Sequence, residues 1–102
     1  MSGKQVIAAF GRIRPSKGTD LVVQALISLL PFYPGWVGVI TGHCKKSDQG
    51  FMESLVRDID AAGLAKRIIF VGDLNDSQIA RWYQRATICV AASRREIGRA
   101  HV

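Results

Sequence analysis

The sequence has no hydrophobic run long enough to cross a membrane. Its richest apolar stretch, residues 21–33, is interrupted by Gln24, Ser28 and Pro31, whereas a membrane-spanning helix needs about 20 predominantly apolar residues. The first residues lack the apolar core of a signal peptide. Only two cysteines are present and they lie far apart, which excludes a disulfide-stapled scaffold. We therefore expect a cytoplasmic protein.

The sequence also lacks clusters of charge of one sign. Its 14 Lys and Arg residues against 8 Asp and Glu give a formal net charge of +6, yet no block of five or six basic residues occurs. A scattered excess favours solubility, with one local anion site, over nucleic-acid binding. With 102 residues, 48% of them hydrophobic, the chain is long enough for one domain and too apolar for a disordered tail.

Four short apolar runs are separated by helical patterns. The runs, which we interpret as strands, are Val6–Phe10, Trp36–Ile40, Ile68–Val71 and Thr87–Ala92. Their near-continuous hydrophobicity predicts strands buried on both faces, as in a parallel sheet. The order β-α-β-α-β-α-β predicts an α/β fold with a partial doubly wound, Rossmann-like parallel sheet. Ligands of such sheets bind beyond the carboxyl ends of the strands.

The helical segments carry apolar faces and end signals. The predicted inner faces are Val22, Ala25, Leu26 and Leu29, widened by Val23, Ile27 and Leu30; Phe51, Leu55, Ile59 and Ala62; and Ile79, Trp82, Tyr83 and Ala86. Gly63 followed by Leu64 predicts a left-handed C-cap, and Asn75 with Gln78 predicts a capping box. Cys89, in the middle of the last apolar run, is expected to be a small core residue.

A glycine-rich basic segment, residues 11–20, follows the first predicted strand and leads directly into a helix. A helix N-terminus suits phosphate, and Arg12 and Lys17 add charged donors, while Gly11 and Gly18 let a ligand approach the backbone closely. The segment does not match the phosphate loop of nucleoside triphosphatases or a dinucleotide fingerprint. The alternatives are an anion site and a solvated basic turn.

Other chemistry-bearing residues are expected to have ordinary roles. The adjacent His43 and Cys44 lack further metal ligands, so we predict no metal site and interpret them as loop residues, with Gly42 marking the turn. Trp82 and Tyr83 have core spacing, which disfavours base stacking. The sequence shows no nucleophilic Ser/His/Asp or Cys/His constellation.

The pattern Gly-Arg-x4-Lys-Gly-x-Asp after the first strand resembles the donor-binding C-terminal domain of family-four type glycosyltransferases, which have two facing Rossmann-like domains. The run FGRIRPSKGTDLVVQALISLLPFYP is most similar to lipopolysaccharide-core mannosyltransferases. The resemblance implies that Arg12 and Lys17 grip the diphosphate of a nucleotide-sugar. It also implies that the loop with Gly72, Asp73 and Leu74 cups the nucleobase with backbone groups.

The resemblance further implies a catalytic pair, Glu-x7-Glu, whose first member would be Glu96 and whose second would fall at position 104. The expected substrate is a nucleotide-sugar, GDP-mannose or a UDP-sugar, with no other cofactor. The expected partners are a glycan or lipid-linked acceptor and an N-terminal acceptor domain of the same enzyme, not nucleic acid. The expected location of the intact enzyme is the cytoplasm, and peripheral association with the inner face of the membrane stays open.

The C-terminal residues have an alternative origin. Residues 96–102 can be encoded by the start of a widely used short-read sequencing adapter, so we expect residues 97–102 not to be native. Residues 1–96 are then the N-terminal part of the nucleotide-sugar-binding domain, which alone we expect to transfer no sugar. Without the resemblance, a stand-alone phosphate- or nucleotide-binding module and a ligand-free interaction domain stay open.

Overall fold

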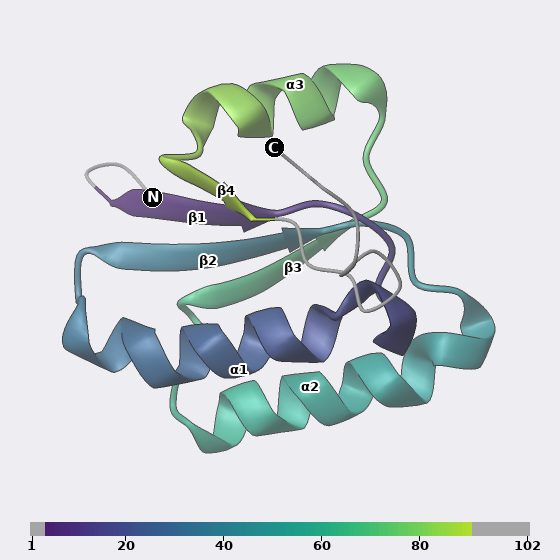
Figure 1. The fold of residues 1–102 in the computed structure, drawn as a ribbon, viewed down its shortest axis with the longest axis horizontal. Helices are drawn as coiled ribbons and strands as arrows, with labels where there is room; N and C mark the ends of the chain where they lie inside the picture. Colours follow the sequence, from purple (N-terminus) through teal and green to yellow (C-terminus); the bar gives the residue numbers. More distant parts are fainter. Residues whose placement is uncertain (1–3, 91–102) are drawn as a thin grey trace, which may run out of the picture.

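The computed structural model describes residues 4–90 as a four-stranded parallel sheet with helices on both faces (Figure 1). The strands are β1 (Gln5–Ala9), β2 (Trp36–Thr41), β3 (Ile68–Gly72) and β4 (Ile88–Val90). The helices are α1 (Thr19–Leu29), α2 (Gln49–Ala61) and α3 (Asp76–Arg85), with short 3-10 turns at Pro15–Lys17, Leu30–Phe32 and Lys46–Asp48. The predicted α/β parallel sheet is confirmed.

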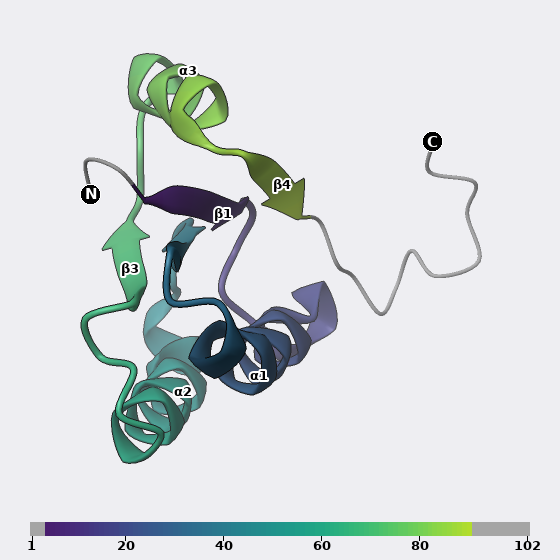
Figure 2. The same ribbon diagram turned by 90° about the vertical axis from the view of Figure 1, so that its left-hand side faces the viewer.

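The strand order is β3-β2-β1-β4, and every neighbouring pair is parallel. From β1 the chain runs through α1 to β2 on one side, and after β3 it returns through α3 to β4 on the other side. Figures 1 and 2 show α1 and α2 on one face and α3 on the opposite face. The order therefore reverses at β1, and the carboxyl ends of β1 and its neighbours are where doubly wound sheets bind ligands.

Both predicted helix-end signals are present. The N–H of Leu64 donates to the carbonyl of Ile59 (3.0 Å) and that of Gly63 to Asp60 (2.9 Å), with Gly63 at φ +74°. This is a Schellman ending, which places Leu64 in the core at 5% exposure. At the start of α3, Asn75 and Gln78 form the reciprocal capping box. These local bonds fix where α2 ends and α3 begins.

The two faces of the sheet differ in how much they bury. Between the sheet and the α1–α2 layer lies one cluster of buried residues: Ala9, Ile13, Val22, Val23, Leu26, Leu30, Ile40, Leu55, Ile59, Leu64 and Ile68. Toward α3 the buried cluster consists of Val6, Ala8, Val37 and Val39, with Trp82 and Ala86 packed against it. Most of the core therefore lies under α1 and α2.

Several predicted core positions are exposed. The buried face of α1 is formed by Val22, Val23 and Leu26 and is continued by Leu30 directly after the helix, so the predictions for Ala25 and Leu29 are wrong. Their side of the helix turns away from the sheet. The prediction for Ala62 is also wrong, because this residue is already the C-cap of α2 and is exposed.

The predictions for Tyr83 and Cys89 are wrong as well. Tyr83 is 54% exposed, and its ring stacks on Phe10 with centroids 4.2 Å apart. Cys89 is exposed because β4 pairs with β1 alone and forms the edge of the described sheet. The expectation of burial on both faces therefore fails for β4. None of the helices in residues 4–90 is long and apolar enough to span a membrane.

Candidate functional site

The loop that follows β1 is folded by the side chain of Thr19, the first residue of α1. Its hydroxyl accepts a hydrogen bond from the N–H of Arg14 (3.3 Å) and lies 3.4 Å from the carbonyl oxygens of Arg12 and Arg14. Thr19 is 7% exposed, so these bonds are shielded from water. The loop is thereby held as a fixed arch over the start of α1.

Arg12 and Lys17 lie in this arch. The Arg12 side chain is exposed and that of Lys17 half-buried, and the arch ends at Gly18, the N-cap of α1 at φ +70°. The N–H groups of Leu21 and Val22 already donate to the carbonyl of Gly18. Two cationic residues therefore belong to the loop that leads into the positive end of an 11-residue helix, and such a helix end attracts anions.

The loops after β1 and β2 touch through their backbones at Gly42. A Cβ atom at this position would lie 1.6 Å from the carbonyl oxygen of Gly11, and Gly42 has a φ of +132°. One residue further on, the N–H of Ile13 donates to the carbonyl of His43 (3.0 Å). Only glycine fits at position 42, and the contact fixes the arch relative to the end of β2.

The loop after β3 is joined to the same place. The register between β2 and β3 shifts after Ile40, so that Thr41 pairs with Gly72. The N–H of Gly42 then donates to the carbonyl of Gly72 (2.9 Å). The loop with Gly72, Asp73 and Leu74 therefore lies beside the end of β2.

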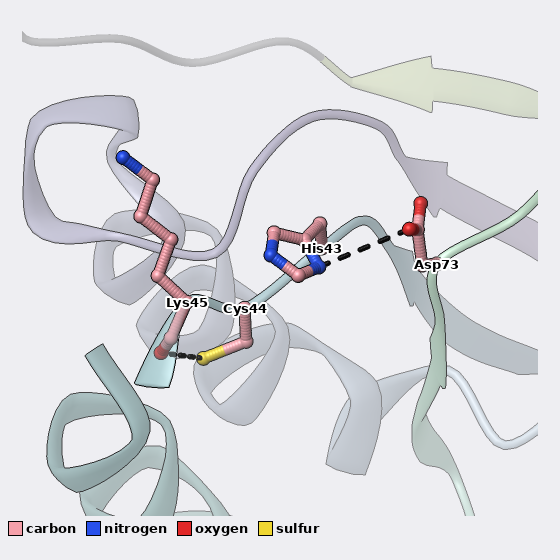
Figure 3. A network of polar contacts seen from close by, with 4 residues as sticks. All are labelled: His43, Cys44, Lys45 and Asp73. Atoms are coloured by element: carbon pink, nitrogen blue, oxygen red, sulfur yellow. Dashed lines mark hydrogen bonds and ion pairs between the residues drawn. The ribbon is translucent and has the colours of Figure 1, made fainter. Parts of the chain in front are cut away.

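A contact between side chains also links the loops after β2 and β3. Nδ1 of His43 lies 3.8 Å from Oδ2 of Asp73, with 56% and 74% of the two side chains exposed. In Figure 3 the His43 ring lies between Lys45 and Asp73, and the ring nitrogen joined by the dashed line faces the carboxylate. The next residue, Cys44, is half-buried; burial, with a smaller effect of the Asp48 charge, raises the pKa of its thiol.

The structure thus places the predicted residues Gly11, Arg12, Lys17 and Gly18 in one arch, and Gly72, Asp73 and Leu74 in a second loop. Gly42 and His43 connect the two. Residue Glu96 lies outside the described residues. Within residues 4–90, no group of three His, Cys, Asp or Glu side chains is arranged to hold a metal ion.

Two open hollows flank this edge, and neither is lined by Arg12 or Lys17. One, of about 400 Å³, is lined by Cys44 and residues of α2. The other, of about 350 Å³, is lined by Leu74 together with Gln78, Arg81, Trp82 and Arg85. Arg57 lines the first of these two hollows and Arg81 and Arg85 line the second, so the cationic groups beside them come from α2 and α3 and not from the arch.

The connecting role of Gly42 and His43 was missed by sequence reasoning, which treated them as turn residues. One signal was available, because a glycine stands within two residues after each of the first three apolar runs: Gly11, Gly42 and Gly72. All three have positive φ. A repeated glycine at the carboxyl ends of adjacent parallel strands indicates backbones that approach one another closely.

Comparison with known proteins finds that residues 1–98 match the family described as glycosyl transferases group 1. The chain is 43% identical over 96 residues to the lipopolysaccharide core biosynthesis mannosyltransferase LpcC of Rhizobium leguminosarum bv. viciae, covering 94% of this chain and 27% of that protein. It is 39% identical to LpsB of Rhizobium meliloti, over 91% of this chain and 26% of that protein. The chain thus spans about a quarter of the length of these relatives.

Solved structures agree. The C-terminal domain of a group 1 glycosyl transferase, LpcC from Francisella tularensis, superposes with a TM-score of 0.85 at 40% identity, covering 89% of this chain and 47% of that chain. The Anabaena protein HepE, solved with UDP and glucose, superposes with a TM-score of 0.80 at 23% identity over 90% of this chain and 24% of that one, a likeness of fold. The chain belongs to the glycosyl transferases group 1 family.

Proposed function

We propose that this chain forms the donor-binding part of a glycosyltransferase that transfers mannose from a nucleotide-sugar to a glycan or lipopolysaccharide-core acceptor. The similarity to two lipopolysaccharide-core mannosyltransferases supports the sugar and the acceptor. The donor is a nucleotide-sugar, GDP-mannose or a UDP-sugar. The observation that carries the proposal is the arch of Gly11, Arg12, Lys17 and Gly18 at the carboxyl end of β1, directly before α1.

Arg12 and Lys17 are assigned to the diphosphate. Within residues 4–90 the Arg12 side chain has no hydrogen bond or ion pair, and it is exposed, so its guanidinium is available to a phosphate at little cost. Arginine offers phosphate a planar fork and lysine a point charge. Gly11, at φ +130° with nothing within 4 Å of the position that a Cβ would take, allows the ligand to approach the backbone from that side. Gly18 supports the turn into α1.

The nucleobase is assigned to the loop of Gly72, Asp73 and Leu74, whose backbone groups would cup it. Gly72 is at φ +80°, and nothing lies within 4 Å of the position that a Cβ would take there, so a flat ring can lie against this backbone. Glu96 is assigned as the first carboxylate of a Glu-x7-Glu pair.

The reaction that this site would serve breaks the bond between the sugar anomeric carbon and the diphosphate oxygen. An acceptor hydroxyl forms the new bond to that carbon and loses its proton, and the nucleoside diphosphate leaves with the electron pair. Negative charge grows on the diphosphate as the bond breaks. Arg12 and Lys17 therefore stabilise the transition state more than the ground state, which is the requirement for catalysis.

The acceptor domain is proposed to lie elsewhere in the intact enzyme, with residues 1–96 as the first part of the donor domain and residues 97–102 derived from a sequencing adapter. The chain spans about a quarter of the relatives' length, which supports the proposal that the acceptor domain lies outside it. By itself the chain should then bind donor without transferring sugar, because transfer requires donor and acceptor held together. We place the intact enzyme in the cytoplasm, peripheral to the inner face of the membrane that carries a lipid-linked acceptor.

Calorimetric titration of the intact enzyme with GDP and UDP tests the assignment. Each charged hydrogen bond to phosphate is worth about 1.5–3 kcal/mol, so Arg12→Ala/Lys17→Ala should weaken binding of the preferred nucleotide about a hundredfold or more. The matched control Arg57→Ala/Lys66→Ala removes the same charges at exposed positions on α2 and before β3, and should change affinity less than about threefold. Equal affinities for the two double variants would contradict the assignment.

A further inference from the structure

Strand order places His43 in the path of any molecule that spans the two loops assigned above. β2 lies between β3 and β1, so the carboxyl end of β2 separates the arch of Arg12 and Lys17 from the loop of Gly72–Leu74. The residues at that end are Gly42 and His43. A nucleotide with its diphosphate at the arch and its base at the loop must cross them with its ribose.

His43 is attached to both loops. Its main-chain carbonyl accepts a hydrogen bond from Ile13 of the arch (3.0 Å), and its imidazole lies 3.8 Å from the carboxylate of Asp73 in the other loop. Because Gly42 has no side chain, the His43 ring is the first side chain beyond the end of β2. Its imidazole is 56% exposed, and Figure 3 shows the ring facing the Asp73 carboxylate. The ring is therefore held in place yet accessible to a ligand.

The contact with Asp73 also decides which atom of the ring is left for a ligand. Nδ1 faces the carboxylate of Asp73 at 3.8 Å, so Nε2, on the other side of the ring, is the atom that a ligand can reach. The nucleotide groups at this point that can form a hydrogen bond with a ring nitrogen are the ribose hydroxyls, which both donate and accept.

We infer that His43 binds the ribose of the donor nucleotide through a hydrogen bond between Nε2 and a ribose hydroxyl, and that Asp73 is the positioning residue that orients the ring. The inference rests on the proposed function, since it assumes a nucleotide spanning the two loops. It adds to that proposal a side chain for the middle of the site. The assignment separates two tasks, with Arg12 and Lys17 binding phosphate and His43 binding the nucleoside.

A surface ion pair without a ligand role is the competing explanation. Exposed pairs contribute about 0–1 kcal/mol to stability, and both side chains here are more than half exposed. Replacing either residue should therefore leave the fold intact under both explanations. Only ligand affinity distinguishes them, and only if phosphate and nucleoside contributions are measured separately.

The experiment is calorimetric titration of the intact enzyme with its preferred nucleoside diphosphate, with the matching 2′,3′-dideoxynucleoside diphosphate and with inorganic pyrophosphate. His43→Ala should weaken binding of the nucleoside diphosphate about tenfold, the value of one good hydrogen bond. It should leave the affinity for the other two ligands within about twofold, because neither has the ribose hydroxyls. His43→Gln, which restores an acceptor, should recover part of the loss, and Asp73→Asn should show a smaller loss of the same kind.

The controls separate the two proposals. Lys45→Ala, an exposed neighbour, should have no effect on the ratio of nucleoside diphosphate to pyrophosphate affinity. If Arg12→Ala/Lys17→Ala weakens binding but His43→Ala does not, the ribose assignment alone is overturned. If His43→Ala weakens pyrophosphate equally, the residue acts through the arch and the assignment is also overturned. If nucleotide binding is insensitive to Arg12 and Lys17 as well, the proposed function itself fails.

Discussion

Two parts of the molecule built from the same kind of β-α unit differ in how closely they are packed. The closed half, β1 through β3 with α1 and α2, holds most of the buried side chains. The open half, α3 and β4, has none in α3, and Ile88 of β4 is 47% exposed. α1 and α2 pack side by side on one face, whereas α3 is the single helix described on the other (Figure 2). How deeply a strand or helix is buried therefore depends on the elements that pack against it and not on its own hydrophobic pattern alone.

The difference also explains why the candidate site has a defined geometry. The arch, Gly42 and the loop after β3 are all joined through β2, the strand with a partner on each side in the closed half. The open half contributes the capping box of α3, which fixes how the chain leaves the Gly72–Leu74 loop. The site is therefore supported mainly by the closed half.

The largest expected effect comes from comparing two glycines with positive φ, Gly42 in the closed half and Gly72 at the junction with the open half. Gly42→Ala puts a Cβ against the carbonyl oxygen of Gly11 and adds backbone strain, so it should lower the free energy of unfolding by about 4 kcal/mol. Gly72→Ala meets open space and should cost about 1 kcal/mol from strain alone. Chemical denaturation measures both. Equal losses would show that backbone contact at Gly42 does not hold the loops together.

A second comparison replaces isoleucine by alanine at one position that faces the sheet in each half. Ile59 of α2 is 3% exposed, and Ile59→Ala should cost about 2–5 kcal/mol because it leaves a cavity in the main cluster. Ile79 of α3 is only half-buried, and Ile79→Ala should cost about 1 kcal/mol. Denaturant midpoints at unchanged slope measure the pair. A loss at Ile79 as large as at Ile59 would contradict the description of an open half.

The smallest effect is a difference in thiol chemistry. Cys89 is exposed, while Cys44 is half-buried with a pKa raised by burial and then by the charge of Asp48. Because the thiolate is the reactive form, alkylation at about pH 8 should modify Cys89 several-fold faster than Cys44. Peptide mass spectrometry over time gives both rates.

The rate at which Cys44 is modified should keep rising with pH beyond the point where the rate for an ordinary thiol levels off, because a raised pKa means that the thiolate forms at higher pH. Asp48→Asn removes the smaller cause of the shift, so it should lower the pKa of Cys44 and increase its rate at fixed pH. Faster modification of Cys44 than of Cys89 in the unsubstituted chain would be the opposite of what the structure indicates.

Local sequence signals predicted most of the fold correctly. The apolar runs predicted three strands to within a residue or two. The cap residues Gly63 and Asn75 marked the helix ends correctly, because each cap hydrogen bond joins residues only a few positions apart in the sequence. These features depend on neighbouring residues alone. For the same reason the placement of Arg12 and Lys17 in one loop followed directly from their spacing.

Burial and contacts between loops could not be predicted in this way. Cys89 and Tyr83 have core-like patterns but are exposed, because what covers a residue comes from distant segments of the chain. The connection made by Gly42 and His43 depends on the register shift between β2 and β3 and on a main-chain bond to Ile13. Strand register and main-chain hydrogen bonds do not depend on particular residue types, so apart from the repeated glycine the sequence contains no sign of them.

The central claim is that the three loops joined at β2 form one nucleotide site. Hydrogen exchange of the intact enzyme, measured with and without a saturating nucleoside diphosphate, tests it most directly. We expect bound nucleotide to slow exchange in peptides that contain Gly11–Gly18, Gly42–His43 and Gly72–Leu74, and to leave exchange unchanged in peptides from the middle of α2. Slowing confined to the hollow beside α3, or no slowing in the Gly11–Gly18 peptide despite bound nucleotide, would contradict it.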